Sequence, residues 1–309
     1  MPQPAVPARV ACRLRHEGRA SSPGTAANGC AQARIGHLVS SKTTSPRIFR
    51  RMPMPLSETV LVFDLETVPD LAAVARVHGL DPADMDGARA KLGAGFPKLL
   101  YHAVVCIGAL IAERRDGAWR VEALGAPHVG ERIEARLIAD FAARVERLRP
   151  QLVSFNEHSF DLPVLRYRAL IQGIPAPGLT TRPYYRRYDE AGLDLCDVLA
   201  NFDARGRIGL DALCRAMGLP GKPEGVDGGN VADLVARGRL DAVAAYCRAD
   251  VVATYRLFLA YEHLRGGLSP DGLARSNADL AAFLARTESL GRRANTAPVD
   301  GAQVAPCAA

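Results

Sequence analysis

The sequence contains no apolar segment long enough to cross a membrane. The best candidate, residues 104–111, is far shorter than the about 20 residues that a membrane-spanning helix needs. We also recognise no secretory signal. A soluble protein is therefore the expectation.

Cysteine pairs with the spacing of metal ligands are absent too. The seven cysteines stand at positions 12, 30, 106, 196, 214, 247 and 307. None of these spacings is that of a zinc ribbon or of a redox motif, and several of the cysteines lie in apolar patterns. We expect reduced thiols and a cytoplasmic protein.

Excess charge is missing from most of the chain, although the net charge of the whole is +6. Residues 1–51 hold nine Lys/Arg and one Glu, a net of +8. Residues 52–309 then keep 30 of the 39 Lys/Arg against 32 of the 33 Asp/Glu, a net of −2. Non-specific coating of a duplex is therefore not expected, and any grip on nucleic acid must come from local patches and bound cations.

The first acidic segment follows an apolar run. The β-branched residues 59–63 predict a buried strand, with Asp64 and Glu66 at its carboxyl end. Side chains alternate along a strand, so both carboxylates are expected on one face. An Asp-x-Glu pair is common by chance in a chain of this length, so the pair alone does not establish a site.

The second acidic segment also follows a strand pattern. Residues 151–155 predict a short strand, which leads through Asn156 and a polar turn to a helix from about Asp161. Asp161 is thus placed at an element junction. Alternatively, Asp161 serves only as a helix N-cap, because Asp is favoured there and Pro163 falls just inside the helix.

The third segment lies within a helical pattern over residues 240–264. Tyr246 and Asp250 are four residues apart and therefore neighbours on one helix face. They border an apolar stripe that includes Cys247, which predicts that they lie at the buried side. The alternative is a half-buried aromatic beside a solvated acid.

Taken together, the three segments supply four carboxylates. Their oxygens are the ligands that Mg²⁺ and Mn²⁺ prefer. Two such ions can assist the attacking and the departing oxygen of a phosphodiester at once. The sequence therefore predicts a site for two divalent cations, Mg²⁺ or Mn²⁺, with the ligands Asp64, Glu66, Asp161 and Asp250.

The motifs resemble those of the DEDD superfamily of 3′–5′ exonucleases, in its tyrosine-containing branch. The similar motifs, in the family's order, are Asp64-Leu65-Glu66-Thr67, Asn156 with Phe160-Asp161, and Tyr246-x-x-x-Asp250. Residues 193–199 and 210–222 more narrowly resemble a bacterial group of predicted exonucleases related to the proofreading domain of family-B DNA polymerases. The resemblance covers roughly residues 60–261.

This resemblance implies a catalytic role for each of the five residues. Asp64 would ligate both cations, whereas Asp161 would help to position one of them. Glu66 and Asp250 would complete the site that binds the attacking water. Tyr246 would orient that water rather than take its proton, because an unperturbed phenol has a pKa of about 10.

Three further motif positions are candidates for substrate binding. Thr67 is expected to contact the terminal nucleotide or, alternatively, to cap the turn before Pro69. Phe160 is expected to stack on or wedge against a base, although core packing is the alternative. Asn156 is expected to tether the loop that presents Asp161.

A basic and aromatic segment over residues 181–188 adds a weaker signal. It mixes three arginines with three tyrosines, a combination that suits single-stranded nucleic acid because arginine binds phosphate and tyrosine stacks on bases. The alternative is a solvated loop anchored by one tyrosine.

The order of the remaining patterns predicts an α/β protein of the ribonuclease H-like kind, three layers with a mixed sheet and helices on both faces. Residues 103–112 and 119–124 predict two strands in an antiparallel meander with the first. The predicted helical segments are residues 131–148, an insertion within 70–100 placed over the site, and a terminal helix at 268–290.

Both ends of the chain lack periodicity. We expect a disordered basic tail over residues 1–54, an exonuclease domain over 55–290 and a disordered tail over 291–309. The basic tail has three interpretations: a start assigned too far upstream, with translation beginning at Met52 or Met54; a transit-type sequence; or a nucleic-acid-binding tail. We favour the first.

The predicted activity is a metal-dependent 3′–5′ exonuclease that releases nucleoside 5′-monophosphates from single-stranded or frayed DNA. Two alternatives stay open. One is an exoribonuclease on short or structured RNA, since nothing in the sequence clearly recognises a 2′-hydroxyl. The other is a catalytically silent module that binds nucleic acid. No membrane contact is expected.

Overall fold

The computed structural model describes residues 57–180, 184, 186–219 and 230–296. The expectations for residues 1–54 and 297–309 therefore lie outside the described residues. No helix in the described part combines the length and the apolar character needed to span a bilayer.

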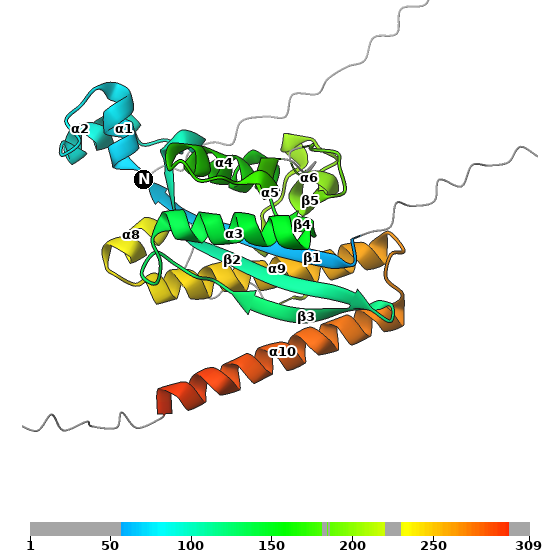
Figure 1. Cartoon of the computed structure of the whole chain (residues 1–309). Helices are drawn as coiled ribbons and strands as arrows, with labels where there is room; N and C mark the ends of the chain where they lie inside the picture. The colour runs from blue at the N-terminus through cyan, green and yellow to red at the C-terminus, as the bar shows by residue number, and fades with distance from the viewer. Residues whose placement is uncertain (1–56, 181–183, 185, 220–229, 297–309) are drawn as a thin grey trace, which may run out of the picture. The chain divides into compact units, whose positions relative to one another are not determined.

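A five-stranded mixed sheet forms the centre of the fold (Figure 1). Its strand order is β3-β2-β1-β4-β5. Strands β1, β2 and β3 run antiparallel as a meander, whereas β4 pairs parallel with β1 and β5 parallel with β4. The bounds are β1 Thr59–Pro69, β2 His102–Arg115, β3 Ala118–Gly125, β4 Gln151–Ser154 and β5 Gly192–Asp194.

Helices cover both faces of this sheet (Figure 1), which confirms the ribonuclease H-like three-layer prediction. One face packs against α9, Leu240–Leu264, and α10, Pro270–Thr296; the other packs against α3, Glu134–Leu148, and α4, Asp161–Ile171. The shorter helices are α5 Pro177–Thr180, α6 Leu195–Leu199, α7 Leu210–Ala216 and α8 Val231–Ala236.

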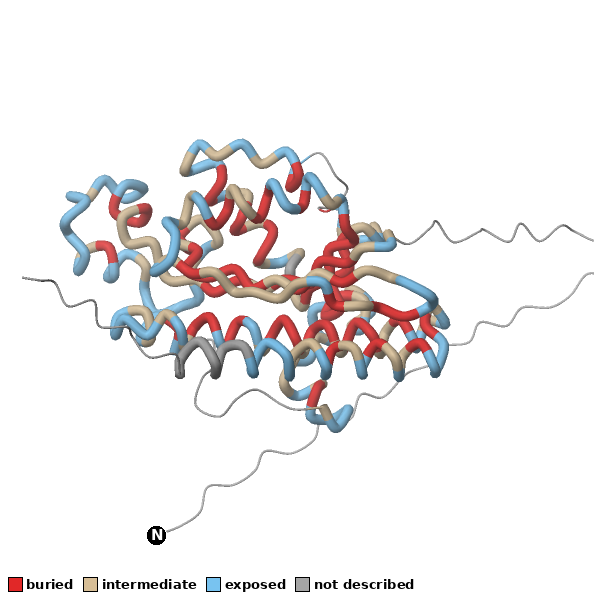
Figure 2. Tube along the Cα trace, turned by 60° about the horizontal axis from the view of Figure 1, so that its bottom comes forward, coloured by how far each residue is buried: buried red, intermediate tan, exposed pale blue. Residues whose placement is uncertain are grey.

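Alternation along β1 divides the core into two clusters. Val60 and Val62 pack on the α9 side with Val251 and Tyr255, whereas Leu61 packs on the α3 side. Buried residues accordingly gather on the strands and on the helix sides that face them (Figure 2). Even-numbered residues of β1 therefore point towards α9. Asp64 and Glu66 continue this even-numbered series, so they lie on the α9 side of the sheet.

The expected insertion between β1 and β2 is helical. It contains α1, Leu71–His78, and α2, Met85–Leu92, which form a small apolar cluster of their own with Tyr101. Asp70 caps α1 by accepting a hydrogen bond from the backbone of Ala73. Because β1 ends at Pro69, the insertion begins beside the acidic segment.

A buried arginine ties this insertion to the domain. Arg168 of α4 donates to Asp70 at 2.5 Å and to Glu134 of α3 at 2.6 Å. Burial alone would lower the pKa of Arg168, but its hydrogen bonds to Glu134 and Asp70 outweigh burial, and the pKa is raised. The charged guanidinium thus joins three helices at their ends.

Several element boundaries differ from the sequence expectation, and two of the differences are large. Strand β1 continues past Phe63 to Pro69, so Asp64 and Glu66 lie within the strand rather than after it, because β2 keeps pairing with this part of β1. Helix α10 continues to Thr296, so the predicted tail over residues 291–309 was wrong for its first six residues. The helix 240–264 agrees with its prediction at both ends.

Candidate active site

Two carboxylates from β1 meet helix α9. Asp64 and Glu66 lie on the same face of β1 as Val60 and Val62, which pack against α9. Among the described residues, Asp64, Glu66 and Cys247 form a group whose potential ligand atoms all lie within 4.8 Å of one another. The prediction that the two acids share a face is confirmed.

Helix α9 approaches the sheet closely at Gly108, the β2 residue paired with Asp64. A Cβ atom at Gly108 would lie 2.7 Å from Cys247 Sγ and 2.8 Å from Val251 Cγ2. Glycine therefore permits the helix to sit against the strands at the level of the acidic pair.

This approach also brings two candidate residues of α9 to the buried side. Tyr246 and Asp250 are 4% and 7% exposed, so neither is a solvated surface residue. The alternative of a half-buried aromatic beside a solvated acid was wrong. Burial follows from their position beside Cys247 and Val251, which lie against β2.

Cys247 is the member of this group that the sequence did not mark as a site residue. Its thiol donates to the backbone carbonyl of Asp64 at 3.5 Å and contacts the carboxylate Oδ2 at 3.6 Å. Burial is the main cause that raises the pKa of the Cys247 thiol well above its usual value. The neighbouring Cys106 and Asp64 raise this pKa further. In the sequence it appeared only as part of an apolar stripe, which is how a buried cysteine packs.

Asp161 lies at the start of α4, after the loop that follows β4. Strand β4 pairs with β1 only as far as Val62 opposite Val153, so this loop leaves the sheet near the level of Asp64. Asp161 is 5% exposed and is the first residue of the helix, whereas Phe160 occupies the N-cap position without a side-chain cap. The N-cap alternative for Asp161 was therefore wrong.

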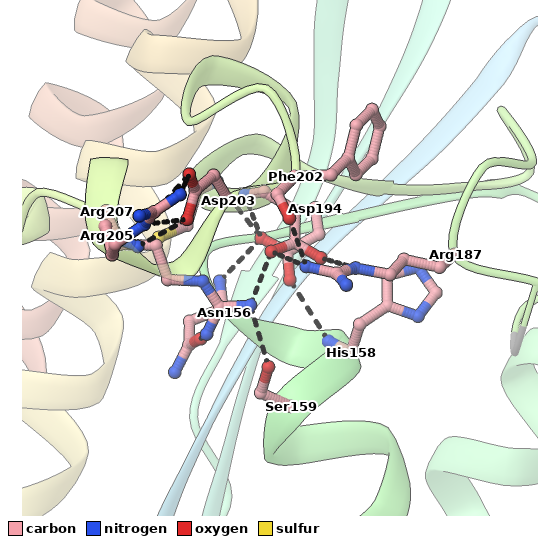
Figure 3. Close-up of polar contacts among 11 residues, drawn as sticks. Asn156, His158, Ser159, Arg187, Asp194, Phe202, Asp203, Arg205 and Arg207 are labelled. Atoms are coloured by element: carbon pink, nitrogen blue, oxygen red, sulfur yellow. Dashed lines mark hydrogen bonds and ion pairs between the residues drawn. The ribbon is translucent and has the colours of Figure 1, made fainter. Parts of the chain in front are cut away.

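The loop before Asp161 is held by polar contacts (Figure 3). Asn156 adopts a positive φ of 78°. Its backbone N–H donates to Asp194 at 2.8 Å, and its side-chain oxygen accepts from Arg207 at 2.8 Å. Asn156 thus tethers this loop, as the sequence led us to expect.

Thr67 and Phe160 meet at His102. Thr67 Oγ1 lies 2.9 Å from His102 Nδ1, and the other ring nitrogen lies 3.2 Å from the carbonyl oxygen of Pro97. The ring of Phe160 contacts that of His102 edge-on at 4.8 Å, and burial lowers the pKa of His102. Thr67 lies in a strand, so the alternative that it caps a turn was wrong. Phe160 is half-buried, with its ring beside the exposed Phe96.

The basic and aromatic segment is largely structural where it is described. Tyr184 is fully buried and donates to the carbonyl of Pro150 at 2.8 Å, which agrees with the alternative of a loop anchored by one tyrosine. Arg187 is engaged by Asp197. Tyr188 is 75% exposed. Residues 181–183 and 185 lie outside the described residues.

Comparison with known families decides the assignment. Residues 94–296, well over half of the chain, match the family described as predicted 3′–5′ exonucleases related to the exonuclease domain of PolB. The chain belongs to this family. The match includes the Asn156–Asp161 and Tyr246–Asp250 motifs but begins after β1, so Asp64 and Glu66 lie outside it. The predicted family and enzyme class, a 3′–5′ exonuclease, are confirmed.

Solved structures with similar chains include a DNA polymerase and an exonuclease. The family B DNA polymerase of the archaeon Pyrobaculum calidifontis matches 69% of this chain with 21% identity and a TM-score of 0.44, over 25% of its own length. Exonuclease I of E. coli, in complex with a dA16 oligonucleotide, matches 73% of this chain with 17% identity and a TM-score of 0.32, over 45% of its length.

In both cases the chain spans less than half of the similar structure. No curated protein matches the sequence.

Proposed function

We propose that this protein is a metal-dependent 3′–5′ exonuclease that removes nucleoside 5′-monophosphates from single-stranded or frayed 3′ ends of DNA. The observation that carries the proposal is the convergence of Asp64 and Glu66 with Cys247 of α9, the helix that also bears Tyr246 and Asp250. A half-buried and a buried acid, Asp64 and Glu66, at the meeting point of two elements suit catalysis better than stability.

The donor set fits hard divalent cations. Two carboxylates within 4.8 Å oppose each other's ionisation unless positive charge lies near them. Asp64 and Glu66, with Asp161 and Asp250, would hold two ions, Mg²⁺ or Mn²⁺. Bound ions would neutralise the phosphate and promote ionisation of the attacking water.

The side chains of the protein have separate tasks in this proposal. Tyr246 would orient the attacking water through its hydroxyl group. Thr67 and Phe160 would contact the terminal nucleotide, whereas Asn156 would act on the substrate indirectly, by fixing the loop before Asp161. DNA is the preferred substrate because the family is related to the exonuclease domain of PolB.

The test is digestion of matched single-stranded DNA and RNA oligonucleotides, labelled at the 5′ end, by the purified full-length protein with Mn²⁺, Mg²⁺ or EDTA. We expect a ladder that shortens from the 3′ end, forms faster on DNA and disappears in EDTA. Faster shortening of RNA would favour the exoribonuclease alternative. Binding of the DNA and RNA oligonucleotides without shortening would favour the alternative of a catalytically silent module that binds nucleic acid.

A further inference from the structure

A buried carboxylate joins two arginines beside the loop that leads to Asp161. Asp197 of α6 is fully buried. It accepts from Arg187 Nε at 2.6 Å and Nη2 at 2.9 Å, and Arg207 Nη2 donates to the same carboxylate. The hydrogen bond from Arg187, with a further one from Arg207, lowers the pKa of Asp197. Such paired, charge-assisted bonds fix the orientation of both guanidinium groups.

Arg207 also reaches the loop that leads to Asp161. Its Nη1 donates to Asn156 Oδ1 at 2.8 Å, and its Nη2 donates to Ser159 Oγ at 2.9 Å. These two residues stand near the beginning and the end of the loop between β4 and α4. The guanidinium group of Arg207 therefore contacts both parts of the loop, while its hydrogen bond to Asp197 fixes its orientation.

A second acid, three residues before Asp197, holds the backbone of the same loop. Asp194, which caps α6, accepts from the backbone N–H groups of Asn156 at 2.8 Å and of His158 at 3.1 Å. The positive φ of Asn156, 78°, is a conformation that needs such support. Asp194 supports the backbone of the loop, and Arg207 supports its side chains.

We propose that Arg207 is a positioning residue for Asp161, which fixes residues 156–159 so that the carboxylate of Asp161 is presented correctly for cation binding. This rests on the proposed function, in which Asp161 is one of the four metal-binding acids. Arginine is required because its planar fork contacts Asp197, Asn156 and Ser159 together, whereas lysine offers a single ammonium.

The same turn offers a matched control. Arg205 lies in the 3₁₀ turn Ala204–Gly206, two residues before Arg207, and its side chain is 91% exposed. It pairs at 2.9 Å with Asp203 at the surface. Arg205→Gln therefore removes a neighbouring arginine without touching the loop before Asp161.

The experiment compares full-length wild type with Arg207→Lys, Ser159→Ala and Arg205→Gln. Three quantities are measured: the rise in melting temperature as a function of Mn²⁺ concentration, and kcat and KM on a 5′-labelled single-stranded oligonucleotide. We expect Arg207→Lys to raise the Mn²⁺ concentration for half-maximal stabilisation, and to lower kcat, by about 10- to 100-fold, as for other residues that orient a metal ligand. KM should change little, because the strand itself is not contacted.

Ser159→Ala should raise the Mn²⁺ concentration for half-maximal stabilisation and lower kcat by smaller factors, since it removes one loop contact and leaves Asp197 paired. It keeps the test decisive if Arg207→Lys does not fold. Arg205→Gln should match wild type.

The inference is overturned if Arg207→Lys and Ser159→Ala keep the wild-type Mn²⁺ response and kcat, or if Arg207→Lys lowers only the metal-free melting temperature. Failure of the proposed function would look different, because wild type would then shorten no oligonucleotide. The Mn²⁺ response would still test the role of Arg207 in that case.

Discussion

The Cys247 thiol lies 3.6 Å from an oxygen of the Asp64 carboxylate, which joins the acidic face of β1 to helix α9. This contact depends on the close approach of α9 to β2 at Gly108. The geometry of the acidic site is therefore coupled to the packing of one helix on one strand. Changes that move α9 should affect stability and metal response together.

Gly108→Ala tests that coupling. The added Cβ would lie 2.7 Å from Cys247 Sγ and 3.3 Å from the backbone oxygen of Cys247, so either the helix or the strand must shift. We expect a loss of about 1–3 kcal/mol in the free energy of unfolding, typical of overpacking, and a weaker Mn²⁺ stabilisation. Urea unfolding with and without Mn²⁺ measures both.

Gly125→Ala is the matched control in the same sheet. At Gly125, near the end of β3, the nearest atom to an added Cβ is 4.0 Å away. This variant should unfold like wild type. Equal free energies of unfolding for the two alanine variants would mean that α9 does not approach β2 closely at Gly108.

Tyr246→Phe should separate catalysis from metal binding. Loss of the hydroxyl removes the group proposed to orient the attacking water, so kcat should fall by about 10- to 100-fold, a range seen when a positioning group is removed. Mn²⁺ stabilisation should persist, because the carboxylates remain. Steady-state kinetics and thermal shift on the same sample decide this point.

Tyr255→Phe provides the comparison on the same helix. The Tyr255 hydroxyl is buried and has no hydrogen-bond partner among the described residues, and burial raises its pKa far above the usual value. Removing an unsatisfied buried hydroxyl should leave kcat unchanged and stability equal or higher. A similar fall in kcat for both variants would mean that Tyr246 acts only through packing.

Asp197→Asn should weaken the fold in a pH-dependent way. The variant leaves two arginines without their carboxylate. The loss should fall below the about 3–5 kcal/mol of a fully buried pair, because the side chain of Arg187 is 38% exposed. The hydrogen bond from Arg187, reinforced by Arg207, holds the pKa of Asp197 below its usual value. Its contribution to stability is therefore present above the unfolded-state pKa and is lost as pH falls through the lowered folded-state pKa.

The measurement is urea unfolding of wild type and Asp197→Asn between neutral and strongly acidic pH. The difference between them should be largest near neutrality and shrink in acid. Asp203→Asn, at a surface pair with Arg205, should show little difference at any pH. A constant difference across the range would exclude charge as the cause of the effect.

Periodicity predicted the elements that carry the site, because each has a regular apolar pattern. The helix 240–264 and the strands around residues 60, 107 and 153 lie where the sequence placed them. The full length of β1 did not follow from its own residues, since pairing with β2 extends the strand through Asp64 and Glu66 to Pro69.

The polar network around Asp197 was not predictable from the sequence. Arg207 and its partner Asn156 are 51 residues apart, and nothing local marks the pair. Arg187 belongs to the segment that carried a weak sequence signal for nucleic-acid binding, yet its guanidinium is engaged by Asp197. Side-chain partners of this kind are set by how β4 and β5 bring their loops together, which only the folded chain shows.

The most direct test of the account is Asp64→Ala in the 5′-labelled digestion with Mn²⁺, beside wild type at equal concentration. Asp64 lies outside the part of the chain that matches the exonuclease family, so its role rests on the contact between β1 and α9. We predict that wild type shortens the strand from the 3′ end while the variant, still folded, leaves it intact and gains no stability from Mn²⁺. A wild-type ladder from the variant would contradict the assignment of this site.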